Sequence, residues 1–237
     1  MRPNYDRARG AIRAFQVTIA VTAIMLVVKI SFAMSFIGII NLGPASLHTF
    51  RVADAFVTNM NYGAIIMCAI VFIKWFRRAY FYIHQLLPQI GFRYSEEWAL
   101  WSWFIPIFNL FGPYQITTDL IVHTEAYLLD KGIMNHRSNL RVIAGWWWGL
   151  WVTRSVLVSF TRRMHTSVDL ATLASVLEVI ICISAIGAAY FAIQMIKRYS
   201  EMEERLEYAF EMYDESNQDH YSGYDGASEE DLLDSGI

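Results

Sequence analysis

The chain has 237 residues, of which 55% are hydrophobic and only 17% are charged. Soluble domains usually carry about 45–50% apolar and about 25% charged residues, so this composition excludes an ordinary soluble enzyme. The aromatic share of 15%, with 8 Trp, is typical of a chain that contacts lipid headgroups. The composition therefore indicates an integral membrane protein.

The net charge of −3 averages two unlike regions. Residues 1–198 hold 18 Lys and Arg against 9 Asp and Glu, a balance of +9. Residues 199–237 hold 1 Arg against 13 Asp and Glu, a balance of −12. We expect a transmembrane helical domain over 1–198. The remainder, 199–237, is expected to be a cytoplasmic acidic tail that is helical to about residue 213 and disordered beyond it.

Four apolar runs predict transmembrane helices in an all-α fold, because about 20 apolar residues are needed to cross a bilayer. They lie at about 14–40, 57–76, 141–161 and 170–196. Residues 41–56 hold Gly, Pro, Ser and Asp and are expected to form a loop. The second run is expected to continue as a helix until Pro88.

The apolar segment 95–113 is interrupted by Pro106, Asn109 and Pro113. It is too short and too broken for a straight span, so we expect a re-entrant hairpin packed inside the bundle. Asn109 is expected to satisfy backbone groups that the prolines leave free. An amphipathic helix is expected to follow over 114–130.

The distribution of Lys and Arg predicts the orientation, since these residues concentrate on the cytoplasmic side. It favours four spans plus the hairpin, with both termini in the cytoplasm. The basic sequence KWFRR (74–78) predicts contact with anionic lipids. We therefore expect membrane lipids as partners, with a protein partner or a second copy of the chain as a further possibility, and no nucleic acid.

Three charged residues lie within the predicted spans: Lys29, Arg154 and Glu178. At 1.5 Å per residue they lie about 8, 10 and 13 Å from the outer edge of a ~30 Å apolar core. An intramembrane charge usually faces a partner or a cavity. Glu178 is therefore expected to pair with Lys29 or Arg154. The cluster is either a structural ion pair or a site for binding or ion handling.

Sequence motifs for catalysis are absent. There is no HExxH, CxxC or GxSxG pattern and no phosphate-binding loop. Asp119 and His123 share a helix face and are weak candidates for a metal site. We expect no catalytic residues, no metal and no cofactor.

Three blocks carry a family resemblance: KWFRRAYFYIHQL (74–86), RYSEEWALWSWFIPIFNLFGPYQ (93–115) and GWWWGLW (145–151). Over about residues 60–160 the chain resembles a bacterial membrane family, domain of unknown function 4328. Matching residues are Trp75, Arg78, Ala79, Trp103, Phe104, Pro106, Asn109, Leu110, Pro113, Trp146 and Trp147. Around residues 82–84 the family's usual Asn is replaced. Arg78 and Tyr94 are expected at the inner mouth of the hairpin.

The resemblance implies a multi-span protein of the bacterial inner membrane and supplies no activity. Two functions from different classes stay open. The first is a non-enzymatic scaffold or accessory subunit, favoured by the lack of catalytic motifs and by the acidic tail. The alternative is a small oligomeric channel, transporter or lipid-binding protein that uses the broken hairpin and the intramembrane charges. A hydrated cavity that reaches Glu178 or Asn109 would favour transport, whereas a dry core with an exposed apolar face would favour a scaffold.

Overall fold

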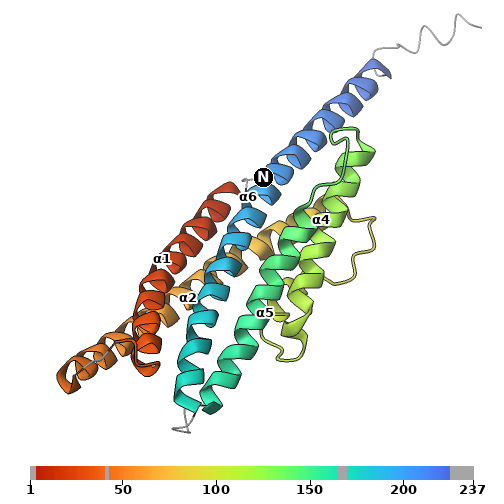
Figure 1. Ribbon diagram of the computed structural model, residues 1–237. Coiled ribbons are helices and arrows are strands. Elements are labelled where there is room, and N and C mark those ends of the chain that lie inside the picture. The colour runs from red at the N-terminus through yellow and green to blue at the C-terminus, as the bar shows by residue number, and fades with distance from the viewer. Residues whose placement is uncertain (1–3, 41–42, 165–169, 225–237) are drawn as a thin grey trace, which may run out of the picture.

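The computed structural model describes residues 4–40, 43–164 and 170–224, and within these ranges it contains helices and loops but no strand (Figure 1). The expected all-α class is confirmed. The long helices are α1 (Tyr5–Phe36), α2 (Pro44–Leu86), α4 (Gly112–Asp130), α5 (Leu140–Met164) and α6 (Ala171–Tyr224). A single turn of helix, α3 (Trp98–Trp101), and the 3-10 turn η1 (Phe108–Leu110) lie between α2 and α4.

Three helices are long and apolar enough to cross a membrane: Tyr5–Ser35, Ser46–Leu86 and Thr172–Met212. They correspond to the predicted first, second and fourth spans. Helix α5 occupies the predicted third span, but Arg154 and the tryptophans lower its mean hydropathy. The structure therefore supports a multi-helix membrane protein with three helices of this kind among the residues it describes.

The boundaries of two elements differ from those expected. The predicted loop over 41–56 is wrong, because α2 already begins at Pro44 with Gly43 preceding it. Proline is favoured in the first turn of a helix, where its missing N–H has no partner to lose. Helix α6 continues past residue 213 to Tyr224. The predicted disorder beyond 224 lies outside the described residues.

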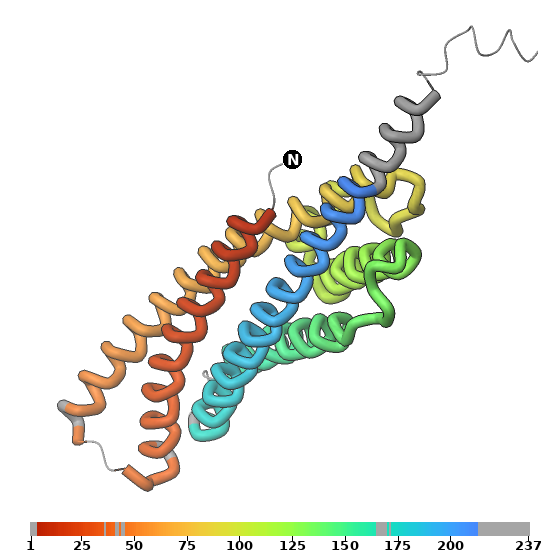
Figure 2. Tube along the Cα trace, turned by 90° about the horizontal axis from the view of Figure 1, so that it is seen from above, coloured from red at the N-terminus to blue at the C-terminus, as the bar shows by residue number. Residues whose placement is uncertain are grey.

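The four longest helices pack side by side in the order α2–α1–α6–α5 (Figure 2). Helix α1 is antiparallel to α2, since Asn4 donates to the carbonyl of Trp75 at 3.3 Å and Thr22 donates to Asn61 at 2.9 Å. Among the described residues, the backbones of α2 and α5 approach each other at few places. Their side chains meet where the Phe72 ring of α2 lies 5.4 Å from the Trp147 ring of α5. The helices therefore form an open arc with a gap between its two ends.

Residues 87–111 fill one end of this gap. The Trp103 ring lies 5.7 Å from Phe72 of α2 and 6.0 Å from Trp148 of α5, both edge to face. The Trp148 indole donates to the Leu110 carbonyl at 3.0 Å. Trp151, also against Trp103, lies about 16 Å along α5 from its first residue at 1.5 Å per residue. The segment thus reaches the middle of the bundle.

Helix α4 then runs back toward the end from which the segment came. Near its C-terminal end, Thr124 lies 3.4 Å from the Tyr199 hydroxyl of α6. At the entry to the segment, the Tyr80 hydroxyl donates to the Tyr94 carbonyl at 2.9 Å. The segment therefore enters and leaves the bundle on the same side.

The tip of this segment exposes a set of large apolar side chains, each between 40% and 77% exposed: Trp101, Phe104, Ile105, Ile107, Leu110 and Phe111. Contiguous exposed apolar surface on a small protein marks contact with a membrane or a partner. The inward side of the same segment is packed through Trp103, so the tip has one packed face and one apolar outer face.

Candidate functional site

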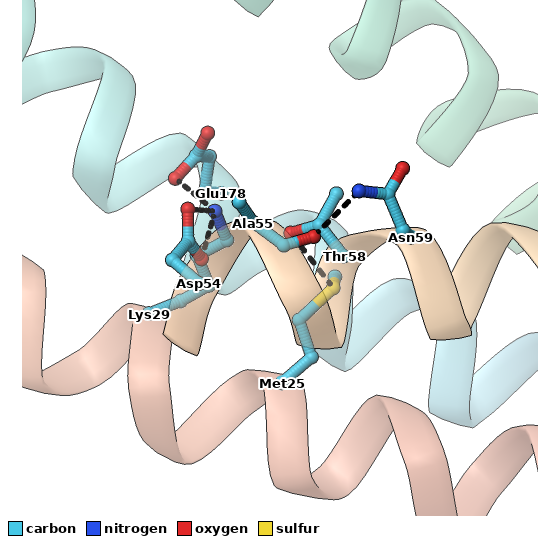
Figure 3. A network of polar contacts seen from close by, with 7 residues as sticks. All are labelled: Met25, Lys29, Asp54, Ala55, Thr58, Asn59 and Glu178. Atoms are coloured by element: carbon cyan, nitrogen blue, oxygen red, sulfur yellow. Dashed lines mark hydrogen bonds and ion pairs between the residues drawn. The ribbon is translucent and has the colours of Figure 1, made fainter. Parts of the chain in front are cut away.

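Three helices meet at the buried ammonium group of Lys29 (Figure 3). The Lys29 side chain on α1 lies 2.7 Å from an oxygen of Asp54 on α2 and 3.1 Å from an oxygen of Glu178 on α6. Lys29 is only 7% exposed. Of the two partners expected for Glu178, Lys29 and Arg154, the structure pairs it with Lys29. We call Lys29, Asp54 and Glu178 the charged cluster.

Asp54 is the member that the sequence reasoning missed, because it was assigned to a loop. The signal that could have found it is Pro44, because proline is favoured in the first turn of a helix. A helix that begins at Pro44 includes Asp54. Moving a charge out of water is costly unless the charge is paired. The two carboxylates surround one ammonium group, so each helix is fixed in register by the same buried cation.

A polar seam between α1 and α2 continues from the charged cluster. Thr22 donates to Asn61 at 2.9 Å, and both residues are buried. One turn further, the Thr18 hydroxyl lies 2.9 Å from the carbonyl of Ala14 and 3.4 Å from that of Ala64. Interhelical hydrogen bonds of this kind hold helices together in lipid, where apolar burial alone gives little preference.

Arg154 on α5 lies apart from the charged cluster. In the part of the chain that the structure describes, no carboxylate lies within 4.0 Å of its guanidinium group. Arg154 nevertheless lines a cavity of about 100 Å³ together with Lys29, Asn61 and Glu178. The structure thus brings all three predicted intramembrane charges to one cavity but pairs only two of them.

A second cavity, of about 110 Å³, borders the first at Arg154. Its walls are apolar and include Phe15, Phe72, Trp103, Trp147 and Trp151. We call the first cavity polar because Lys29, Asn61 and Glu178 line it, although most of its surface is apolar. Arg154 therefore lies where the polar cavity meets the apolar one. A single molecule with a charged end and an apolar end could occupy both spaces.

The tryptophans of the family motif take different positions. Trp75 and Trp147 are buried, and Trp103 packs between α2 and α5 as described above. Trp146 is 58% exposed and its ring stacks 6.1 Å from Phe191 of α6. Of these four, Trp103 and Trp147 line the apolar cavity, together with Trp151 of α5.

The prolines and Asn109 shape the segment rather than the cavities. Pro113 is buried in the first turn of α4, where the Thr117 hydroxyl donates to its carbonyl at 2.7 Å. Pro106 lies in the exposed tip. The side-chain oxygen of Asn109 is buried and has no hydrogen-bond partner among the described residues. The expected role of this oxygen in satisfying free backbone groups is therefore not seen.

Arg78 and Tyr94 face different neighbours. The Tyr94 hydroxyl donates to Gln115 of α4, at the entry to the segment. The Arg78 guanidinium lies over the ring of Phe81 at 5.4 Å and borders a small hollow with Asn4 of α1. Tyr94 therefore ties the segment before α4 to α4 itself, whereas Arg78 belongs to the surface shared by α1, α2 and α6.

Asp119 and His123 lie on α4 beside the ring of Phe92, which is 4.8 Å from the His123 ring. No group of three or more His, Cys, Asp or Glu side chains is placed to hold a metal ion within the described ranges. Burial raises the pKa of the Asp119 carboxyl, although Arg93 and His123 oppose the shift. Burial also lowers the pKa of His123, against the attraction of Asp119. Both groups are thus held toward their neutral forms.

Comparison with known proteins gives one match. A family model described as a domain of unknown function (DUF4328) matches residues 40–201. This range is more than half of the 237 residues and includes the resemblance noted over about 60–160. No curated protein and no solved structure matches the chain.

The charged cluster predicts unequal effects of two substitutions. Lys29→Met leaves two carboxylates together without their cation, and removal of one partner from a buried ion pair costs about 3–5 kcal/mol of unfolding free energy. Glu178→Gln leaves Lys29 paired with Asp54 and should cost less. Thermal unfolding in mild detergent, followed by circular dichroism, measures both. Equal losses for the two variants would contradict the shared-cation arrangement.

A matched control is the triple variant Lys29→Met, Asp54→Leu, Glu178→Leu. Replacement of a whole buried charge cluster by apolar side chains is often neutral or stabilising. The triple variant should therefore unfold at a higher temperature than Lys29→Met alone. If it unfolds at the same or a lower temperature, the loss in Lys29→Met does not arise from unpaired carboxylates.

The two shifted groups on α4 predict pH effects of opposite sign. Because the pKa of the Asp119 carboxyl is raised in the folded protein, this group stabilises the fold fully at pH values below its ordinary pKa near 3.8. The contribution is lost as the pH rises through the raised pKa. Asp119→Asn should therefore gain stability relative to wild type between about pH 4 and about pH 7. A lowered histidine pKa destabilises the fold as pH falls below 6.5, so His123→Gln should gain relative to wild type on acidification. Unfolding temperatures measured across this range test both, and differences that do not change with pH would contradict the burial.

Proposed function

The chain belongs to the DUF4328 family, whose function is unassigned, and we propose from its geometry that it binds an anionic, lipid-like amphiphile taken from the membrane. In this proposal it is an integral membrane protein without catalytic activity. It needs no cofactor and no nucleic acid. The observation that carries the proposal is the position of Arg154 between a polar and an apolar cavity.

The charges favour an anionic headgroup. Within the polar cavity, Glu178 is already engaged with Lys29. Arg154 and Arg162 also line the cavity, and Arg154 has no carboxylate within 4.0 Å in the described part of the chain. A guanidinium group forms paired hydrogen bonds with a carboxylate or phosphate. A half-buried cation with no carboxylate partner among the described residues is therefore suited to a ligand that brings the anion.

The size and position of the cavities favour a ligand that stays partly in the bilayer. Volumes of about 100 and 110 Å³ hold a headgroup and the first part of a chain, since whole-ligand pockets span about 300–1,000 Å³. The gap between α2 and α5 borders both cavities. We infer that the remainder of the apolar chain passes through this gap into the surrounding lipid.

A scaffold or accessory-subunit role is the second candidate. It is supported by α6, which projects beyond the other helices through Tyr224 (Figure 1). The projecting part exposes Tyr208 and Met212. A helix of this kind, followed by an acidic segment, offers a surface to a protein partner or to a second copy of the chain.

The proposed placement in the membrane has four crossings, α1, α2, α5 and α6, with residues 95–113 as a re-entrant hairpin. Helix α5 packs along α6, so the two helices share one depth. The exposed apolar tip of the hairpin then contacts lipid. We place both termini in the cytoplasm, from the distribution of Lys and Arg. We take the membrane to be the bacterial inner membrane, from the family resemblance.

This placement predicts which loops are accessible from outside the cell. His48 lies near the start of α2, and Asn135 lies in the loop between α4 and α5. Cysteines introduced at these two positions should react differently with a membrane-impermeant maleimide. His48→Cys should be labelled in intact cells and Asn135→Cys only after permeabilisation. Labelling of both in intact cells would contradict a hairpin that returns to the cytoplasm.

The amphiphile proposal predicts that Arg154→Gln releases the bound molecule. Hydrogen bonds to charged groups contribute about 1.5–3 kcal/mol, so we expect about a 10- to 100-fold weaker interaction. Native mass spectrometry of the protein purified in mild detergent measures the bound lipid. Arg51→Gln, which removes an exposed arginine near the start of α2, is the control and should keep it.

Three results would overturn this proposal. The first is wild-type protein that carries no amphiphile. The second is equal amounts of bound amphiphile in the Arg154→Gln and Arg51→Gln variants. A stoichiometric protein partner without bound lipid would favour the scaffold role instead. Arg154 is not part of the charged cluster, so Arg154→Gln should fold as wild type does. The unfolding temperature of each variant checks this.

A further inference from the structure

Four basic residues converge on a hollow at the end of α1 and α2 opposite the charged cluster. Lys74, Arg77, Arg78 and Phe81 follow one another at helical spacing and so share one face of α2. Arg7 from the first turn of α1 completes the hollow, which has a volume of about 630 Å³. We call these five residues the basic hollow.

The cations of the basic hollow form no ion pair among the residues that the structure describes. In the described part of the chain, none of the four has a carboxylate within 4.0 Å. Arg78 lies between the hollow and Glu203, Glu204 and Glu207 of α6, which border it from the other side. Arg7, Lys74 and Arg77 are exposed. These three residues therefore carry most of its available positive charge.

The position of the hollow coincides with the end of the lipid-facing surface. The preceding turns of α2 expose Ile66, Met67 and Ile70. Apolar side chains this exposed on a candidate span are placed to contact acyl chains. Lys74 follows one turn after Ile70, so the hollow lies at the level where lipid phosphates occur.

From these observations we propose that the basic hollow binds the headgroup of an anionic phospholipid carrying two phosphates, in the leaflet at the C-terminal end of α2. Guanidinium groups bind phosphate oxygens in pairs, and Lys contributes a further point charge. Four cations from two helices carry more positive charge than one phosphate group requires. The acyl chains of the lipid then lie along the exposed apolar face of α2. This site is distinct from the cavities at Arg154.

Lipid titration of the full chain tests the proposal. Diphosphatidylglycerol, phosphatidylglycerol and phosphatidylethanolamine are added separately to protein in mild detergent, and binding is measured by native mass spectrometry. We expect the strongest binding for diphosphatidylglycerol. The triple variant Arg7→Gln, Lys74→Gln, Arg77→Gln should bind this lipid about 100-fold more weakly, since each interfacial charge contributes a factor of about 5.

A charge-matched control separates this site from a general loss of positive charge. Arg137→Gln, Arg141→Gln, Arg205→Gln removes three exposed cations from the same end of the molecule. The control should bind diphosphatidylglycerol as wild type does. Unfolding temperatures of both triple variants should match wild type, because the substituted side chains are exposed.

Two results would overturn the proposal. Equal binding by the two triple variants would show that the hollow is not the site. Inorganic pyrophosphate that displaces the lipid completely, and binds as tightly as the lipid does, would show that the hollow recognises a soluble anion. The proposal instead requires pyrophosphate to compete weakly, because the apolar face of α2 contributes to lipid binding.

Discussion

The buried ammonium group of Lys29 is the interaction on which the arrangement of the helices depends. It contacts Asp54 and Glu178, so one cation ties α1 to both α2 and α6 in the apolar layer. The cost of leaving any of these charges unpaired opposes sliding or separation of the three helices. Helix α5 is not tied in this way. It packs against α6, α4 and Trp103, and its Trp147 ring contacts Phe72 of α2. Arg154 of α5 lines both cavities.

The open order α2–α1–α6–α5 explains why this membrane protein contains cavities at all. At one end of the bundle the gap between α2 and α5 is filled by Trp103 and α4, which pack against both sides. Toward the other end no element fills it among the described residues, and the two cavities meet there at Arg154. Trp103, from the segment between α2 and α4, lines the apolar cavity, and this connects the family motif to the proposed ligand site.

Sequence reasoning found the elements for which a strong physical cost applies. Long apolar runs predicted the helices, and the cost of an intramembrane charge predicted that Glu178 pairs with Lys29 or Arg154. Asp54 was missed because Gly, Pro and Ser suggested a loop where Pro44 begins a helix. The cavities could not be predicted, since they arise from the distance between α2 and α5, which depends on packing rather than on local pattern. For the same reason, Asn109 was assigned a hydrogen-bonding role that the structure does not show.

The central claim is that a molecule with a charged and an apolar end occupies the space beside Arg154. An experimental structure of the protein in lipid nanodiscs tests it most directly. The account predicts continuous elongated density that begins at the Arg154 guanidinium group, passes the Trp103 and Trp147 rings, and leaves between α2 and α5. Closure of α2 onto α5 beside Arg154, beyond the existing Phe72–Trp147 contact, with Arg154 paired to a carboxylate of the protein and no density between the helices, would contradict it.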